Sequence, residues 1–376
     1  MERHEHTLKS GCLGTRRTVS SFHFGAPDSG GKAYIQASLH ADELPGMLVA
    51  WYLKRELNRL EAEGCVTGEI IVVPQANPIG HAQALLGTPL GRFELASGNN
   101  FNRHYPRLSD AVYARVKERL GADAAGNTRL IRAAIRSELA LREDESELDS
   151  QRTILMSLAA DADIVLDLHC DLHAALHVYT GTPLWEQCAP LARLLGSSAQ
   201  LLATESGDEP FDEACSQTWW HIRDRCLADG LEVPIDMACL AVTVELRGQR
   251  QVSHALASRD AAAILDFLRL RGLIHSAAAP LLPELRFPAT PLAGSENLKA
   301  PFPGLVCFHV EPGDVVTVGQ PVADIIDPLD DTVVTLSSAY GGMVYAVSNH
   351  PYAMAGASVA KVATNSVIKS GKLLSA

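Results

Sequence analysis

The sequence lacks the features that mark membrane, secreted or nucleic-acid-binding proteins. No stretch approaches the roughly 20 apolar residues of a membrane-spanning helix, and residues 1–17 have no apolar core resembling a signal peptide. The eight cysteines form no C-x-x-C pair, so free thiols in a cytoplasmic protein are the simplest interpretation. The formal net charge of -12 argues against a surface that must neutralise nucleic-acid phosphates.

Two common catalytic signatures are also missing. The chain contains no G-x-S-x-G motif, which positions a serine nucleophile, and no H-E-x-x-H zinc motif. What it does contain is ordinary globular material, with 47% hydrophobic and 20% charged residues. Its 376 residues are enough for a large core and two domains.

Residues 1–285 have the pattern of an α/β domain. Continuous apolar runs suit strands that are buried on both faces of a sheet, and longer amphipathic runs suit helices. Their alternation indicates a mixed sheet flanked by helices. The expected strands are residues 33–39, 68–73, 162–169 and 239–248, and the expected helices lie within 46–64, 109–160 and 257–274.

Residues 286–376 are expected to form a separate, all-β domain. The stretch 279–304 is rich in proline and glycine and is interpreted as a linker. Short Val-rich runs follow, split by turns, which is typical of a small barrel or sandwich. The stretch 311–325, "EPGDVVTVGQPVADI", resembles the biotinyl/lipoyl barrel. No carrier lysine stands at a hairpin tip, so we expect a structural or interface-forming unit without a covalent cofactor.

The first candidate site follows the expected strand 33–39, in "YIQASLHADELPG". His40 and Glu43 stand at the carboxyl end of that strand, where ligands collect in open α/β sheets. Imidazole and carboxylate groups both suit Zn²⁺. Asp42 is the alternative to Glu43, and a solvated pair at a helix start is the alternative to a metal site.

The second candidate is Asp167-Leu168-His169, which closes another apolar run. Burying an aspartate and a histidine there without partners is costly, so a ligand role for His169 is favoured over a backbone-satisfied histidine. His169, His173 and His177 also stand at helical spacing, so a helix face remains an alternative, with His173 as the reserve ligand.

Glu245 and a short polar loop supply the remaining candidates. Glu245 ends a buried run, where partial burial can raise its pKa towards the range useful for a general base. A surface pair with Arg247 is the alternative. In "GRFELASGNNFNRHYP", the side chains of Arg92, Asn102 and Arg103 could bind a carboxylate, although a plain surface loop has the same composition.

Taken in order, these motifs resemble the succinylglutamate desuccinylase/aspartoacylase family, relatives of the zinc carboxypeptidases. The resemblance covers residues 33–270 and implies one zinc ion per chain, held by three ligands, with a base that activates water. It departs from the family pattern at Ala41 and Arg247. The matching residues are His40, Glu43, Asn77-Pro78, Arg92, Asn102-Arg103, Asp167-Leu168-His169 and Glu245.

The resemblance assigns a role to each of these positions. It implies zinc ligation by His40, Glu43 and His169, and a base at Glu245. It also implies substrate contacts, which fall on Arg92, Asn102, Arg103 and Asn77.

We therefore expect a zinc-dependent hydrolase that cleaves the amide bond of a small N-acyl amino acid. A zinc carboxypeptidase acting on short peptides and a catalytically silent binding protein are the alternatives. The expected location is the cytoplasm, with no nucleic-acid or membrane partner. The acyl group, the amino acid and assembly into a homo-oligomer are left open by the sequence.

Overall fold

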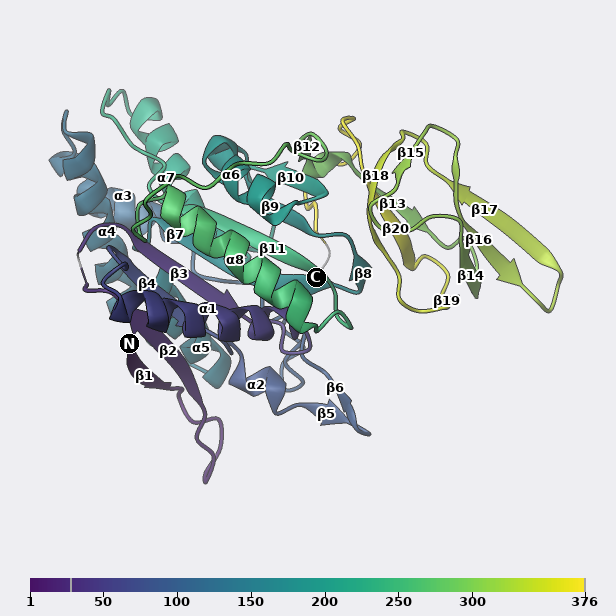
Figure 1. Ribbon diagram of the computed structural model, residues 1–376, viewed down its shortest axis with the longest axis horizontal. Coiled ribbons are helices and arrows are strands. Elements are labelled where there is room, and N and C mark those ends of the chain that lie inside the picture. The colour runs from purple at the N-terminus through teal and green to yellow at the C-terminus, as the bar shows by residue number, and fades with distance from the viewer. Residues whose placement is uncertain (28, 375–376) are drawn as a thin grey trace.

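A nine-stranded sheet forms the centre of the larger part of the molecule (Figure 1). The computed structural model describes residues 1–27 and 29–374. From one edge to the other, the strands are β1 (Glu2–Thr7), β2 (Thr18–Phe24), β4 (Glu69–Val73), β3 (Lys32–Ala37), β7 (Ile164–Asp171), β11 (Leu240–Gly248), β9 (His177–Gly181), β10 (Ala199–Ala203) and β12 (Thr290–Pro291).

The central strands of this sheet are parallel, which brings their carboxyl ends to one edge. β4, β3, β7 and β11 pair in parallel, and β9 then pairs with β11 in the antiparallel direction. Residues 70–73 of β4 are all buried, as expected of a strand with helices over both faces. The residues that follow β3, and those at the ends of β7 and β11, therefore meet at the edge where ligands collect in such sheets.

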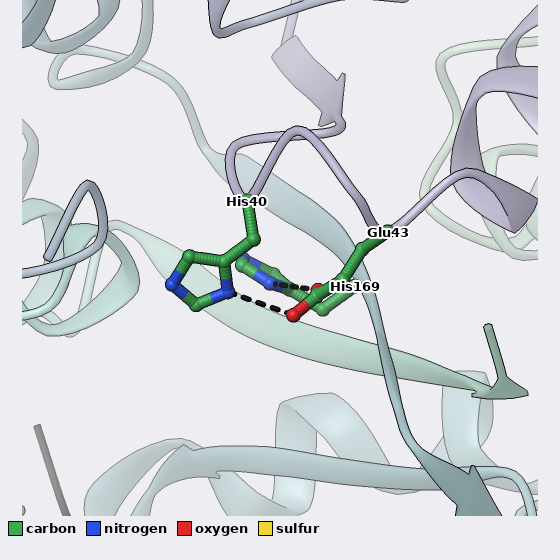
Figure 2. A group of neighbouring side chains, drawn as sticks. All are labelled: His40, Glu43 and His169. Carbon is green, nitrogen blue, oxygen red and sulfur yellow. Dashed lines mark hydrogen bonds and ion pairs between the residues drawn. The ribbon is translucent and has the colours of Figure 1, made fainter. Parts of the chain in front are cut away.

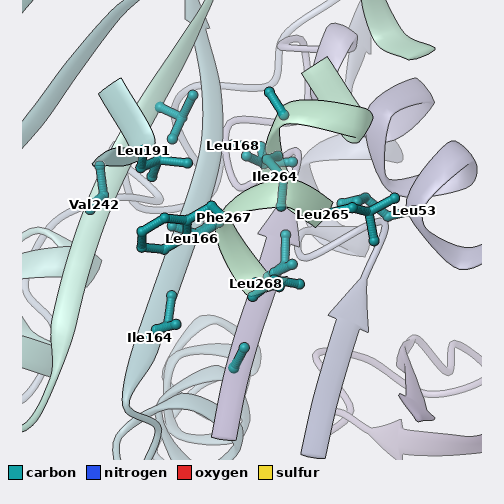
Figure 3. Close-up of a cluster of buried hydrophobic side chains, with 14 of the residues drawn as sticks. Leu53, Ile164, Leu166, Leu168, Leu191, Val242, Ile264, Leu265, Phe267 and Leu268 are labelled. Carbon is teal, nitrogen blue, oxygen red and sulfur yellow. The ribbon is translucent and has the colours of Figure 1, made fainter. Parts of the chain in front are cut away.

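Helices cover both faces of the sheet, and alternate residues of each strand point to opposite layers. On β7, Ile164 and Leu166 pack against one helical layer (Figure 3), whereas Val165 packs against the other. Each fully buried side chain of this kind contributes about 1.5–3 kcal/mol by leaving water. The first layer contains α1 (Pro45–Ala62), α6 (Trp185–Leu195) and α8 (His254–Leu270), and the second contains α3 (Ser109–Val116), α4 (Ala124–Ala140), α5 (Glu147–Ala159) and α7 (Phe211–Ala228).

Several short elements lie between the longer strands and helices. A one-turn helix and a small hairpin lie between β4 and the polar loop that contains Arg92. They are α2 (Pro78–His81), β5 (Ala84–Leu85) and β6 (Thr88–Pro89), and the 3₁₀ turns elsewhere are η1 (Lys117–Arg119), η2 (Thr182–Leu184) and η3 (Leu292–Gly294).

Two further sheets form the predicted all-β part of the chain, to one side of the large sheet (Figure 1). Val322 and Val344, one from each sheet, share an apolar cluster, so the two sheets pack together as a sandwich. Among the described residues the sheets stay open and do not close into a barrel. One contains β13 (Ser295–Lys299), β20 (Ser358–Ala363), β18 (Gly342–Val347) and β15 (Val315–Val316), and the other β17 (Thr332–Ser337), β16 (Pro321–Asp327), β14 (Gly304–Phe308) and β19 (Tyr352–Ala353).

The interpretation of residues 279–304 as a linker is wrong in part. Within this stretch, β12 pairs with β10 of the large sheet, and β13 is a strand of the sandwich. In addition, β8 (His173–Ala174) pairs with β18 of the sandwich. Because strands pair across the predicted division at residue 285, the two parts are joined by backbone hydrogen bonds, and that boundary stays a prediction.

The predicted strands and helices of the α/β part are present, with ends shifted by a few residues. The exception is the alternative that placed three histidines on one helix, which is wrong. His169, His173 and His177 lie on β7, β8 and β9, whose backbones pair with neighbouring strands. Among the described residues, no helix is long and apolar enough to cross a membrane.

Candidate metal centre and substrate cavity

Three buried side chains, two from the turn after β3 and one from β7, meet at the carboxyl edge of the sheet (Figure 2). His40 follows β3, Glu43 precedes α1, and His169 lies on β7. Glu43 Oε1 is 2.8 Å from His40 Nδ1, and Glu43 Oε2 is 2.7 Å from His169 Nδ1. One ligand atom from each residue lies within 4.8 Å of the others, so the group is able to hold a metal ion.

The turn between β3 and α1 brings two of these residues into place. Ser38 adopts a left-handed backbone with a φ of 61°. At Gly46, an added Cβ would lie 2.9 Å from both the Cβ and the carbonyl oxygen of Leu168. Because glycine has no Cβ, the first turn of α1 can approach β7 closely. This close approach sets Glu43 beside His169.

The hydrogen bonds of His40 determine which ring nitrogen is free. His40 Nε2 is 2.8 Å from Asn100 Oδ1, and the same Oδ1 accepts the backbone N–H of Asn102 at 2.8 Å. This atom of Asn100 is therefore the oxygen, and His40 Nε2 carries a proton and donates. In a neutral imidazole, the lone pair of Nδ1 then points at Glu43.

His169 is arranged in the same way. Its Nε2 is 2.9 Å from Asp167 Oδ2, and the other oxygen of Asp167 accepts from Gln36 Nε2 at 3.0 Å. This short ion-pair contact with an acceptor oxygen favours a proton on His169 Nε2, which leaves Nδ1 facing Glu43. Two imidazole lone pairs facing one carboxylate require protons or a cation between them. Such partners are typical of metal-binding histidines, and the donor set fits a divalent metal such as zinc.

The electrostatics of the group favour positive charge. Burial opposes ionisation of Glu43, but His40 and His169 hold the pKa of its carboxyl well below its usual range. Burial lowers the pKa of His40. Burial also acts to lower the pKa of His169, but Asp167 and Glu43 raise it well above its usual value. The carboxylate of Glu43 thus remains ionised and attracts a cation into the group.

Glu245 lies next to this group, as the sequence predicted. In the parallel pairing of β11 with β7, Glu245 is the register partner of His169, and both line one cavity. Glu245 Oε2 is buried and has no hydrogen-bond partner among the described residues. Burial and the nearby carboxylate of Glu43 raise the pKa of Glu245 to about 8. A carboxyl group with this pKa can accept and return a proton near neutral pH.

The polar loop places Arg92, Asn102 and Arg103 in the same cavity. Arg92 Nη1 is 3.5 Å from Glu43 Oε1, and the Arg92 side chain is 42% exposed, so it can move towards a ligand. Asn102 Nδ2 is 3.5 Å from His169 Nε2. Arg103 is buried, its Nη1 donates to the Asn102 carbonyl at 2.6 Å, and burial lowers the pKa of its guanidinium.

Asn77 does not line this cavity. Its Oδ1 accepts the Gly80 N–H at 2.7 Å, which caps α2, and its Nδ2 donates to the Leu39 carbonyl at 2.8 Å. Asn77 therefore holds the backbone before His40, and its predicted contact with substrate stays a prediction. Asp42, the alternative ligand, lies outside the metal group and accepts from Gln249 Nε2 at 3.3 Å.

The cavity also contains charged residues that were not predicted from the sequence. Lys361 of β20 reaches in from the sandwich and pairs with Asp171 at 2.8 Å. Asp212 and Glu213 open α7, where burial raises their pKa values to about 6 and about 8. The available signal for Lys361 was its position as the lone charge in the β run "SVAKVA".

The protein thus has an α/β fold with a buried His–Glu–His group at the carboxyl edge of its mixed sheet. The family model for the succinylglutamate desuccinylase/aspartoacylase catalytic domain matches residues 29–271. The chain belongs to this family, which confirms the family predicted from the sequence. No curated protein sequence gives a significant match.

Solved structures agree with this assignment. A family protein from Shewanella amazonensis is 26% identical with a TM-score of 0.85, over 97% of this chain and 99% of the other. A second, from Shewanella frigidimarina, is also 26% identical with a TM-score of 0.85, over 97% of each chain. The ectoine utilization protein EutE (DoeB) from Ruegeria pomeroyi, in its product-bound form, is 16% identical with a TM-score of 0.66, over 96% and 95%, and shares the fold.

Proposed function

We propose that the protein is a zinc-dependent hydrolase that cleaves the amide bond of a small N-acyl amino acid. The observation that carries this proposal is the pairing of two functions at one edge of the sheet. His40, Glu43 and His169 form a group that could hold a metal ion. Glu245 stands beside it in the same cavity, and its Oε2 has no hydrogen-bond partner among the described residues. Three protein ligands leave a position open, which is the arrangement of catalytic zinc sites.

Each residue of the group has a defined task in this reaction. Zinc, when bound, would polarise the amide carbonyl and lower the pKa of water. Glu245 accepts the proton of the attacking water and passes it to the nitrogen of the leaving amine. Asn100 and Asp167 orient the two imidazole rings, so that His40 and His169 present Nδ1 as the ligand atom.

Arg92, Asn102 and Arg103 are the proposed substrate-binding residues. A guanidinium group binds a carboxylate through two parallel hydrogen bonds, which fixes the orientation of an amino acid. Arg103 is held in the cavity wall by its bond to the Asn102 carbonyl, whereas Arg92 is half-exposed beside Glu43. This arrangement favours a substrate that presents a carboxylate near the metal group.

Zinc analysis and a substrate panel test the proposal. Purified protein should contain about one zinc per chain and hydrolyse at least one N-acyl amino acid in a panel varied in both acyl group and amino acid. Short peptides belong in the same panel, since preferential cleavage of peptides would favour a carboxypeptidase. Bound zinc without hydrolysis of any compound would favour a binding protein.

A further inference from the structure

The proposed substrate cavity is lined by both polar and apolar side chains. The metal group, Glu245 and the arginines are polar. Five apolar lining residues from four separate parts of the chain belong to one hydrophobic cluster, which we call the apolar end of the cavity: Tyr179, Leu201, Ala203, Leu292 and Leu374. Leu374 belongs to residues 368–374, a stretch without regular structure that we call the closing segment.

The closing segment runs back from the sandwich to the large sheet (Figure 1). Its first part is fixed by the Ala293 carbonyl, which accepts the N–H groups of Ile368 and Lys369 at 2.9 and 3.0 Å. Its last part is fixed by the N–H of Leu373, which donates to the Ser206 carbonyl at 2.9 Å. Both ends of the segment are therefore hydrogen-bonded to residues that lie beside the cavity.

The loop that receives the segment is itself held in an unusual conformation. Asp208 and Glu209 have φ values of 59° and 45°, which non-glycine residues adopt rarely. Their carbonyls accept the N–H groups of His104 and Tyr105 at 2.8 and 3.1 Å. The loop is thereby tied to the chain just after Arg103, a proposed substrate-binding residue. Such strain persists only where surrounding contacts over-determine it.

Two further contacts fit the segment to this loop. Lys372 forms an ion pair with Asp208. Gly207 has a φ of 106°, and a Cβ added there would lie 3.1 Å from Lys372 Cγ, so the side chain packs tightly over the glycine. Together, the backbone bond, the ion pair and this close packing place Leu374 at the apolar end of the cavity.

We infer that the closing segment is a wall of the substrate cavity and that Leu374 limits the length of the hydrocarbon group the enzyme accepts. The inference rests on the proposed hydrolase function. The hydrocarbon group belongs either to the acyl chain or to the amino acid side chain. Two substrate series distinguish these sources: one varies the acyl chain on a fixed amino acid, and the other varies the amino acid on a fixed acetyl group.

The test compares three variants in the full chain. Leu374→Ala enlarges the apolar end, and Leu374→Trp fills it. Leu373→Ala is the matched control, because Leu373 packs on the same apolar cluster but does not line the cavity. Hydrogen exchange of the peptide that contains residues 368–374 reports whether the segment is held against the cavity. This readout does not depend on catalytic activity.

In one of the two series, Leu374→Ala should shift the preferred substrate to a longer hydrocarbon group by about 10-fold in kcat/KM. Leu374→Trp should shift it to a shorter one, and Leu373→Ala should leave the order unchanged. An unaltered length profile in both series, from active variants, would overturn the inference. Absence of hydrolysis by the parent protein would count against the proposed function instead. In that case hydrogen exchange alone tests the closing segment. Complete exchange of its backbone amides at the shortest labelling time would overturn its role as a cavity wall.

Discussion

Replacing Glu245 with glutamine should abolish most activity and at the same time stabilise the protein. Glutamine keeps the shape of the side chain and removes the proton acceptor. Loss of a general base typically costs about 10²–10⁴-fold in rate. Zinc content should stay near that of the parent, because Glu245 is outside the group of three ligands.

The gain in stability follows from the Glu245 carboxyl, whose Oε2 is buried and has no hydrogen-bond partner in the described part of the chain. The pKa of Glu245 is raised from 4.5 to about 8 in the folded chain. At pH 7 the unfolded chain has lost this proton, while the folded chain mostly keeps it. Between pH 4.5 and 7, the raised pKa therefore costs the folded state about 2–3 kcal/mol of stability. The lower part of this range allows for the partial exposure of the side chain. Glu245→Gln removes this cost, so the metal-free variant should be more stable by that amount at pH 7.

The sign of the pH dependence makes this a strict test. Below pH 4.5 the Glu245 carboxyl is protonated in both states, and its contribution to stability is fully present. As pH rises towards about 8, the unfolded chain loses the proton first, so stability falls. Urea unfolding of metal-stripped parent and Glu245→Gln protein at pH 5 and pH 8 should show a difference that grows with pH. A difference independent of pH would refute the electrostatic reasoning. Retained kcat would refute the base and direct attention to Asp42 or Asp171.

Four further substitutions test other parts of the site. His169→Ala should strongly reduce zinc content by elemental analysis, and full retention would favour Asp42 or His173 as ligand. Gly46→Ala should weaken zinc binding by at least about 10-fold in a chelator competition, because its Cβ would meet Leu168. Arg103→Lys should lower kcat/KM by about 10- to 100-fold, since lysine lacks the planar fork, and a near-normal value would exclude a substrate contact. Glu213→Gln should reduce the loss of stability between pH 5 and 8, because burial, reinforced by Asp212, raises the pKa of Glu213 to about 8; an unchanged slope in urea unfolding would contradict this.

The four central strands of the large sheet, β4, β3, β7 and β11, could be predicted from the sequence because they are short apolar runs with clear ends. Runs such as residues 162–169 are buried on both faces and carry polar groups only where they reach the edge of the sheet. The pairing of β12 with β10 could not be predicted in this way. Thr290–Pro291 is a two-residue strand within a proline-rich stretch, so its own composition indicates a linker. Thr290–Pro291 belongs to the sheet only because its backbone pairs with β10, which its own sequence does not indicate.

The metal group could be predicted to a similar extent. His40, Glu43 and His169 each follow or end a strand, and parallel strands bring such residues to one edge. Asn77 shows the limit of this reasoning, since its place in the family pattern gives no hint that both ends of its side chain bind backbone atoms. Lys361 was missed because it is far along the chain, in a part expected to be structural.

The contribution of the sandwich to the cavity changes how that part of the chain is understood. Lys361 of β20 forms an ion pair with Asp171, two residues beyond His169, and the closing segment adds Leu374 to the lining of the same cavity. The pairing of β8 with β18 holds these contributions in register with β7. In the proposed hydrolase, the metal group on the large sheet would supply the chemistry, and side chains from both parts of the chain would enclose the substrate. The β sandwich is therefore a structural part of the proposed substrate cavity rather than an appendage to the large sheet.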